Sequence, residues 1–354
     1  MSAREDVFDP WQHQEPLHAA APNPSAGITK IADVAPLDDQ FGAARLKSIP
    51  DALYPALFGP LKESKESIDE IGAKERPQNA PSYTYALLDA AKIPNLVEML
   101  FTSGLEHRCL FKGAAFEELK DVAPWIVRLE DDHRFTRQLF TKGQVPWNLW
   151  DKEPGVYLRS NASLDELWAH FRKFTRVQDE DGKWFVAKFW NGVLWAAFTR
   201  NAALMDLPLF YALSAGVERF VYTNDAPDQW FVIEPTRGQN AGRLKPCITR
   251  DLVLACNEIV ELRHETADIN HAIVALMGDK SAAKIPRKTY ADVRKWLIHN
   301  GFRDAEHIRA ALTTLAQRGM LVDKNWNAEL HAMLCDSARG PGVRLWMLQN
   351  RQWD

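Results

Sequence analysis

The segment Glu261–His271, which reads ELRHETADINH, has the clearest metal-binding pattern in the sequence. Its acidic and histidine residues recur at spacings of three, four and seven, which places them on one face of a helix. These residues are Glu261, His264, Glu265, Asp268 and His271. Glu261-x-x-His264 is also half of the motif found in di-iron helical bundles, which need matching ligands on partner helices. A metal-dependent hydrolase is therefore one hypothesis, and a solvated, charged helix surface is the simpler interpretation.

The run Asp131-Asp132-His133 contains residue types that could act as a general acid and base. It also directly precedes a predicted helix. Acidic residues near the positive end of a helix are stabilised by the helix dipole, and this explains the run more simply.

Residues 290–322 could form a helix-turn-helix, because two periodic segments flank Asn300-Gly301. A DNA-binding helix-turn-helix would need basic residues on its second helix. Arg309 and Arg318 are offset there by Asp304 and Glu306, so a structural helical hairpin is the favoured interpretation over a DNA-binding regulator.

The common phosphate, dinucleotide, acyl-transfer and zinc-protease motifs are absent from the sequence. Cys109 lies in an apolar strand pattern, which favours a packed thiol over a nucleophile. No catalytic residue, resident metal or cofactor is predicted.

The chain has 354 residues and a formal net charge of −4, so it lacks the positive field that would attract nucleic acid or anionic membranes. The N-terminus lacks a signal-peptide pattern and no apolar run approaches the roughly 20 residues of a membrane span, so a cytoplasmic location is expected.

Thirteen tryptophans supply large side chains of the kind that anchor interfaces. Trp147, Trp150, Trp190 and Trp195 are the predicted anchors. Arg159, Arg172 and Lys173 are the predicted charged contacts.

The pattern along the chain predicts three parts. Residues 1–80 are expected to be a poorly ordered arm and linker, residues 81–236 an α/β lobe and residues 248–354 a mainly helical lobe. The α/β (α+β) lobe is expected to hold a mostly mixed central sheet flanked by helices. Strands are predicted at 85–88, 108–111, 125–129, 156–159, 184–189 and 229–233. Ser163 and Glu166 form a capping box that begins the most clearly periodic helix.

Several sequence segments occur in a familiar order. They are YALLD at Tyr85–Asp89, CLFKG at Cys109–Gly113, VAPW at Val122–Trp125, GVYLRS at Gly155–Ser160, ASLDEL at Ala162–Leu167 and FRKF at Phe171–Phe174. Over about residues 83–200 the chain thereby resembles the type VI secretion effector chaperones, the Tap or TEC adaptor family. The family residues expected to be structural are Tyr85, Asp89, Cys109, Pro124, Leu158, Ser163, Phe171 and Phe189. Where relatives tend to have Asp-Pro after an aromatic pair, this chain has Asn191-Gly192, which makes a turn by a different route.

The resemblance implies a non-enzymatic cytoplasmic adaptor. Its partners would be a cognate toxic effector and the spike protein VgrG, with neither nucleic acid nor membrane as a partner. Such an adaptor needs one surface for its cargo and one for the spike, and we expect the two lobes to divide these tasks.

Overall fold

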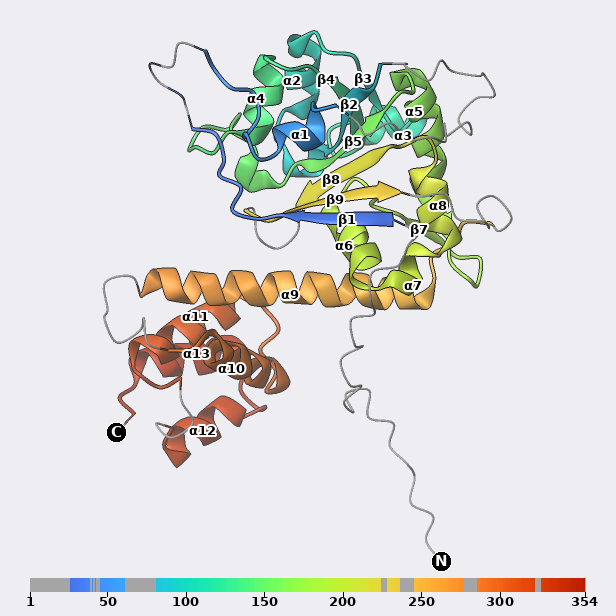
Figure 1. The fold of residues 1–354 in the computed structure, drawn as a ribbon. Helices are drawn as coiled ribbons and strands as arrows, with labels where there is room; N and C mark the ends of the chain where they lie inside the picture. The colour runs from blue at the N-terminus through green and yellow to red at the C-terminus, as the bar shows by residue number, and fades with distance from the viewer. Residues whose placement is uncertain are drawn as a thin grey trace, which may run out of the picture. The chain divides into compact units, whose positions relative to one another are not determined.

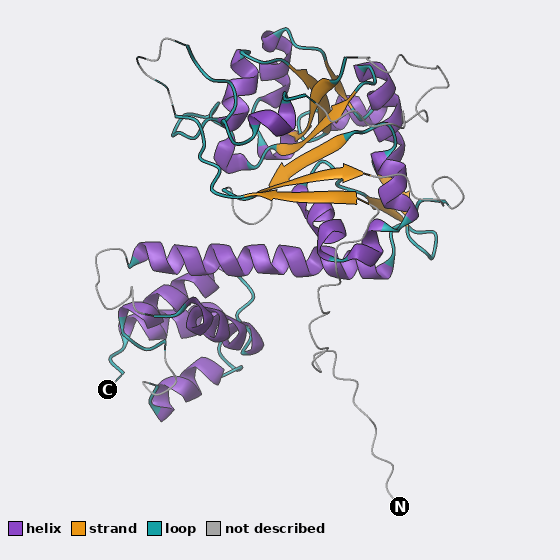
Figure 2. Ribbon diagram, viewed as in Figure 1, coloured by secondary structure: helices purple, strands orange, loops and turns teal. Residues whose placement is uncertain are grey.

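The structure, a computed structural model, describes residues 26–38, 40, 42, 45–60, 81–223, 228–235, 245–276, 285–321 and 326–353. The chain divides into unit 1, Met1–Cys256, and unit 2, Asn257–Asp354. Unit 1 combines a sheet with helices and unit 2 is helical, which confirms the predicted fold class (Figure 1; Figure 2). The boundary between the units lies within α9 (Arg250–Ala275), later in the chain than the predicted boundary between residues 236 and 248.

Unit 1 is built on one seven-stranded sheet. Its strand order is β1 (Ala26–Ile31), β9 (Trp230–Pro235), β8 (Arg219–Thr223), β5 (Gly155–Ser160), β2 (Tyr83–Asp89), β4 (Pro124–Leu129) and β3 (His107–Cys109). Every strand pair described in this sheet is antiparallel, so the sheet is not the mixed one expected. The connections from β2 to β3 and from β4 to β5 do join strands of the same direction. These strands are not neighbours, however, because an oppositely directed strand lies between them in the sheet, β4 in the first case and β2 in the second.

Helices cover both faces of the sheet (Figure 1). One face packs on α1 (Tyr54–Leu57), α2 (Leu96–Ser103) and α4 (Arg134–Phe140) through a core that includes Leu57, Leu100 and Phe140. On the other face lie α5 (Leu164–Phe171), α6 (Gly192–Arg200) and α8 (Pro208–Ser214). Trp195 of α6 stacks there on Phe220 of β8 with ring centroids 3.9 Å apart. The central strand β2 is buried on both faces, which explains its nearly continuous apolar sequence.

The described part of residues 1–80 differs from the expected loose arm. β1 pairs with β9 along its whole length, and α1 contributes to the core through Ala56 and Leu57. The sequence AGITKI has a weak strand pattern of its own, and its conformation depends on the partner strand. Residues 1–25 and 61–80 lie outside the described part of the chain.

Four of the family residues expected to be structural fix loops and helix ends. The Tyr85 hydroxyl donates to the Ala162 carbonyl at 2.6 Å. Asp89 accepts from the Ala91 amide at 3.1 Å and thereby begins a short 3-10 helix, η1 (Ala90–Lys92). The Pro124 carbonyl accepts from the Leu110 amide at 2.9 Å. Ser163 and Glu166 form the predicted capping box at the start of α5.

The other four family residues lie in the interior. Leu158, Phe171 and Phe189 are fully buried and Cys109 is 7% exposed. The rings of Phe171 and Phe189 stack with centroids 5.4 Å apart. Asn191 caps α6 by accepting from the Val193 amide at 3.1 Å, so the Asn-Gly departure from the family pattern still begins a helix.

A small hairpin lies beside the main sheet. It consists of β6 (Arg176–Gln178) and β7 (Trp184–Val186), joined by a turn in which Gly182 has a φ of +83°. Glycine adopts this positive φ at little cost, which suits the tight turn of the hairpin. The backbone amide of Ile248 donates to the Gln178 carbonyl at 2.9 Å, so the segment before α9 covers the outer side of β6.

Unit 2 consists of the second part of α9 with α10 (Arg287–His299), α11 (Ala305–Gln317), α12 (Ala328–Cys335) and α13 (Pro341–Asn350). Their core includes Tyr290, Leu297, Leu312 and Leu334. The two periodic segments predicted on either side of Asn300-Gly301 correspond to α10 and α11. No helix within the described residues of either unit has the length and apolar character needed to cross a bilayer.

Candidate protein-binding surface

Exposed apolar side chains lie on the segments that precede and follow β3, the last strand of the main sheet. Phe101 is 65% exposed, Val122 53% and Leu119 42%. Phe101 projects from α2, which ends at Gly104 with a φ of +77°. Leu119 ends α3 (Ala114–Leu119), and Val122 follows it just before β4. We call Phe101, Leu119 and Val122 the β3-edge surface.

Trp125 forms a rigid aromatic base for this surface. It is 2% exposed, and its indole N–H donates to the Lys120 carbonyl at 3.0 Å. Its ring centroid lies 6.4 Å from that of Phe101, 5.9 Å from that of His107 and 6.2 Å from that of Phe116. Phe101 also meets His107 edge to face with centroids 4.9 Å apart. Because a packed aromatic cluster supports Phe101, the exposed ring is held in place, as in interface anchors.

The other face of β3 carries positive charge. The guanidinium of Arg108 lies 3.7 Å from the ring centroid of Trp168, and that of Arg172 lies 4.6 Å from it. The Trp168 indole N–H donates to the Cys109 carbonyl at 2.7 Å, which fixes α5 to this strand. Arg108 also pairs with Asp165. The end of the sheet thus combines aromatic and arginine side chains, the two classes most enriched in protein interfaces.

The predicted anchors separate into one exposed and three buried residues. Trp147 is 49% exposed, which suits an anchor. Trp150, Trp190 and Trp195 are only 5%, 3% and 0% exposed, so the prediction that they are surface anchors is wrong. Their rings pack on other aromatic residues of the core, as where Trp150 lies 5.6 Å from Trp230 between centroids. Proximity to charged residues in the sequence did not reveal that the tryptophans point inward.

The predicted charged contacts also differ among themselves. Arg159 is 6% exposed, and its guanidinium donates to the Gly59 carbonyl at 2.9 Å, so it fastens the segment after α1 and is not available to a partner. Burial lowers the pKa of Arg159. Arg172 is half-buried against Trp168, and Lys173 is exposed. Arg172 and Lys173 remain candidates for contacts with a partner.

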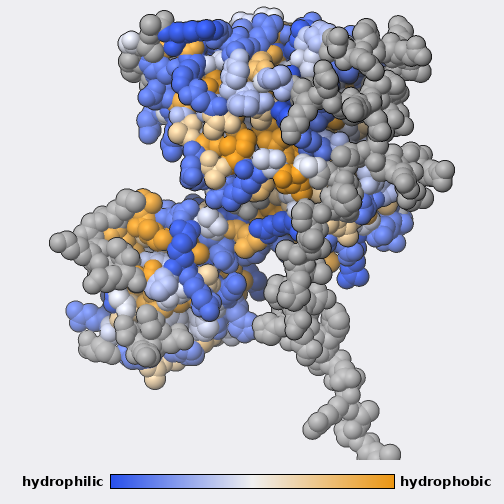
Figure 3. All heavy atoms as spheres, viewed as in Figure 1, coloured by the Kyte–Doolittle hydropathy of each residue, from blue (hydrophilic) through white to orange (hydrophobic). Residues whose placement is uncertain are grey.

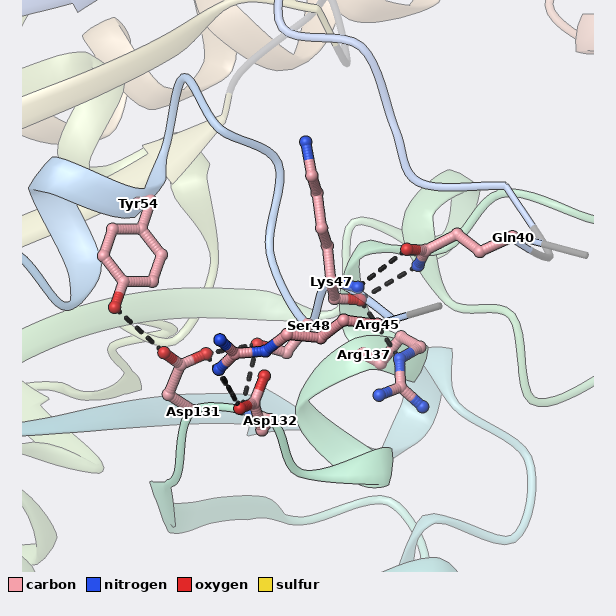
Figure 4. Close-up of polar contacts among 8 residues, drawn as sticks. All are labelled: Gln40, Arg45, Lys47, Ser48, Tyr54, Asp131, Asp132 and Arg137. Atoms are coloured by element: carbon pink, nitrogen blue, oxygen red, sulfur yellow. Dashed lines mark hydrogen bonds and ion pairs between the residues drawn. The ribbon is translucent and has the colours of Figure 1, made fainter. Parts of the chain in front are cut away.

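Asp131 and Asp132 hold the described N-terminal segment on the sheet, as Figure 4 shows. Asp131 accepts from the Ser48 hydroxyl at 2.6 Å and from the Tyr54 hydroxyl at 2.9 Å. Asp132 pairs with Arg45 at 2.5 Å. Partial burial raises the pKa of Asp131, but hydrogen bonds from Ser48, Tyr54 and the Asp132 amide outweigh it and leave the pKa below its usual value.

His133 completes this turn as the N-cap of α4. Its Nδ1 accepts from the Phe135 amide at 3.1 Å, in agreement with the interpretation of this run as a helix start. The run therefore attaches one segment to another through hydrogen bonds. A carboxylate with a lowered pKa is also a poor proton acceptor near neutral pH.

The predicted metal face on α9 is an ion-pair network. Asp268 is 1% exposed and accepts from Nε of Arg294 and from Nε of Arg309, each at 2.8 Å. Glu261 pairs with the same Arg294 at 2.6 Å, whereas His264 and His271 are exposed. The described residues contain no group of three or more His, Cys, Asp or Glu side chains that could hold a metal ion. Two of the three carboxylates of the predicted metal face are thus occupied by arginine partners, which weighs against the hydrolase hypothesis.

The helices of the proposed DNA-binding hairpin use their arginines internally. Arg309 pairs with Asp268, and Arg318 donates to the carbonyls of Gln349 and Arg351, each at 2.7 Å. The recognition helix of a DNA-binding protein needs basic side chains that extend to bases and phosphates. The arrangement favours the structural interpretation of residues 290–322.

Cys109 is a packed thiol. Burial raises its pKa to about 11, and its sulfur accepts from the Phe111 amide at 3.4 Å. A thiol with this pKa is almost entirely protonated at neutral pH, so it is unsuited to nucleophilic attack.

The β3-edge surface was missed because Phe101, Leu119 and Val122 look like ordinary core residues in the sequence. A signal was available in α2, where Leu96 and Leu100 share the buried face. Phe101 is one residue further on and therefore points about 100° away from Leu100 around the helix. A large aromatic residue off the buried stripe is a usable sign of an exposed anchor.

The opposite edge of the sheet is also partly apolar. On the face of unit 1 seen in Figure 3, hydrophobic residues are visible over β8, β9 and β1. Ile31 of β1 and Phe231 of β9 are half-buried there. No described residue of β1, β8 or β9 is an exposed aromatic side chain of the kind that distinguishes the β3-edge surface.

Comparison with known proteins identifies one matching family. Residues 84–202 match the family described as "Domain of unknown function (DUF4123)". The match extends from β2 to the start of α7 (Ala202–Met205), so it includes the β3-edge surface, Trp168 and the β6–β7 hairpin. Neither the curated proteins nor the solved structures give a significant match to this chain. This part of unit 1 is therefore where the chain is similar to a known family.

Proposed function

We propose that this protein is a non-enzymatic adaptor of type VI secretion, which binds a cognate toxic effector in the cytoplasm and loads it onto the VgrG spike. The observation that carries the proposal is the match of residues 84–202 to DUF4123, a family associated with adaptors of type VI effectors. The segments quoted from the sequence, such as CLFKG and ASLDEL, lie within the same residues.

The effector is proposed to bind the β3-edge surface, with Phe101 as the central anchor. Among the large hydrophobic residues that the structure describes, Phe101 has the largest exposed fraction, at 65%, and it is supported by Trp125 and His107. Arg172 and Lys173 would add charged contacts close to this end of the sheet. A stable complex would bury roughly 1,200 to 2,000 Å² in total, and a few anchors would supply most of the affinity.

The spike is proposed to bind unit 2. Trp346 and Val343 on α13 are 60% and 53% exposed, and they give this unit an apolar surface of its own. Two separate surfaces would let the adaptor hold its cargo while it engages VgrG.

The test is an affinity pull-down of the tagged protein from cells that produce the secretion system, with bound proteins identified by mass spectrometry. We expect recovery of one effector encoded beside the adaptor gene, together with VgrG. Phe101→Ser should reduce effector recovery at least tenfold. Trp346→Ser, a matched change at a similarly exposed aromatic residue, should leave effector recovery unchanged and reduce that of VgrG.

Two results would count against these proposals. Recovery of neither an effector nor VgrG would overturn the adaptor function. Effector recovery that depends on Trp346 and not on Phe101 would keep the adaptor function and overturn the assignment of the two surfaces.

A further inference from the structure

The β6–β7 hairpin has an open edge. β7 pairs with β6 on one side, and within the described residues no strand pairs with its other side. Trp184 and Val186, two residues apart on this strand, are 54% and 53% exposed. Side chains two apart in a strand lie on the same face, so these two form one apolar stripe.

The register of the hairpin also determines where the backbone groups of β7 point. The Asp179 amide donates to the Lys183 carbonyl at 2.9 Å, so these two residues are a hydrogen-bonded pair. Such pairs alternate along an antiparallel ladder, which makes Val177 and Phe185 the next bonded pair. The N–H and C=O groups of Trp184 and Val186 therefore point away from β6, toward the open edge. The edge offers both backbone bonding groups and apolar side chains to an added strand.

The charges along the hairpin strands are positive. Arg176, Lys183 and Lys188 are exposed, and none of them forms an ion pair with another described residue. The guanidinium of Arg176 lies 5.5 Å from the ring centroid of Trp184, and the Lys183 ammonium lies 5.2 Å from that of Phe185. By the alternation of side chains along a strand, Arg176 lies with Trp184 on the face of the apolar stripe and Lys183 lies with Phe185 on the other face, so both faces of the hairpin carry positive charge.

The nearby acidic residues belong to the turn. Asp179 accepts from the Asp181 and Lys183 amides at 3.0 and 2.8 Å. Glu180 accepts from the Arg250 amide at 3.1 Å. These carboxylates shape the turn and the start of α9, which leaves the strand edge itself cationic.

We propose that the open edge of β7 binds an extended, acidic segment of a partner protein by strand addition. The backbone of the segment would pair with Trp184 and Val186, its apolar side chains would cover theirs, and its acidic side chains would meet Lys183, Lys188 and Arg176. The inference rests on the proposed adaptor function, because it names the chemistry of one segment that the adaptor would hold.

A second copy of this chain is the less suitable occupant. The edge of β7 could pair with itself in an antiparallel register centred on Phe185, in which Trp184 of each strand lies opposite Val186 of the other. Such pairing would bring two cationic edges together and leave Lys183 and Lys188 of both strands without an acidic partner, whereas an acidic segment would supply one.

The test uses the purified full chain, labelled with ¹⁵N at tryptophan and valine, and two blocked octapeptides as probes. One peptide alternates glutamate with valine, and the other alternates lysine with valine. The glutamate peptide should slow amide hydrogen exchange at Trp184 and Val186 and should bind at least tenfold more tightly than the lysine peptide. A double change, Lys183→Glu with Lys188→Glu, should reverse this preference.

Backbone pairing is tested by Val186→Pro. This change removes an N–H that makes no bond to β6, and proline is tolerated at such edge positions, so the hairpin should remain folded. Binding of the glutamate peptide should fall at least tenfold, while Val186→Thr, which keeps the N–H, should largely retain it. Equal binding of both peptides, or unchanged amide exchange at β7, would overturn the inference.

A dimer that forms with increasing concentration and is lost in Val186→Pro would show that a second copy occupies the edge, and this too would overturn it. The peptide measurements use no effector, so their outcome is separate from that of the pull-down. Recovery of an effector without peptide binding would preserve the adaptor function and remove only the strand-addition surface.

Discussion

Asp268 and Arg294 form a buried ion pair in unit 2, with the guanidinium Nε 2.8 Å from the carboxylate Oδ2. Only 1% of the Asp268 side chain and 4% of the Arg294 side chain is exposed. Arg309 donates to the other oxygen of Asp268 at 2.8 Å, so one carboxylate links α9 to both α10 and α11. One of the five residues of the predicted metal face therefore organises the core of the helical unit.

Asp268→Ala should destabilise unit 2 strongly. The change leaves Arg294 buried without its main partner, and breaking a buried ion pair from one side costs about 3–5 kcal/mol. Hydrogen exchange of α10 and α11 amides should accelerate accordingly, while amides of the β2–β4–β5 sheet should not change.

The matched control for Asp268 is Glu261→Gln, because Glu261 pairs with the same arginine but its side chain is 58% exposed. Exposed ion pairs contribute at most about 1 kcal/mol, so exchange should change little. Equal acceleration of hydrogen exchange in the two variants would show that the burial of Asp268 does not determine its contribution to the stability of unit 2.

Trp147 and Trp195 should respond oppositely to truncation. Trp195→Ala removes a fully buried ring that stacks on Phe220, and such truncations cost about 3–5 kcal/mol. Trp147→Ala should change the free energy of unfolding by less than about 1 kcal/mol, because half of this side chain is exposed. Urea unfolding of the two variants measures both values. A large loss of stability in Trp147→Ala would mean that Trp147 is a packing residue and not a free anchor.

These two tryptophans illustrate what could be learned from the sequence. Periodicity and capping residues located the α/β unit, the helical unit and the start of α5 at Ser163, because these features depend on neighbouring residues. The direction in which a tryptophan points depends on contacts with residues far away in the chain, such as Phe220 for Trp195. β1 was missed for the same reason, since its conformation depends on pairing with β9. The β3-edge surface was the least predictable part, because whether a side chain is exposed depends on how all the other elements of the fold pack around it.

Cys109 should react slowly with iodoacetamide at pH 8. Burial raises its pKa to about 11, so only about one thiol in a thousand is ionised at that pH, and the side chain is 7% exposed. Half-buried Cys335 provides the internal comparison and should be alkylated faster. Peptide mass spectrometry after timed labelling resolves the two sites. Preferential labelling of Cys109 would contradict the assignment of a packed thiol and would reopen a nucleophilic role.

His170 should make the folding of unit 1 sensitive to mild acid. Burial lowers its pKa from the usual 6.5 to about 4. Above pH 6.5 the residue is neutral in both the folded and the unfolded chain, so it adds no pH dependence. Between pH 6.5 and 4 the unfolded chain binds a proton that the folded chain does not, so stability falls as the pH falls. The slope attributable to this residue is at most about 1.4 kcal/mol per pH unit. Urea unfolding at several pH values should show a shallower dependence in His170→Gln than in the unmodified chain, since glutamine does not titrate. Parallel stability curves for the two proteins would show that His170 accepts its proton as readily in the folded state as in the unfolded one.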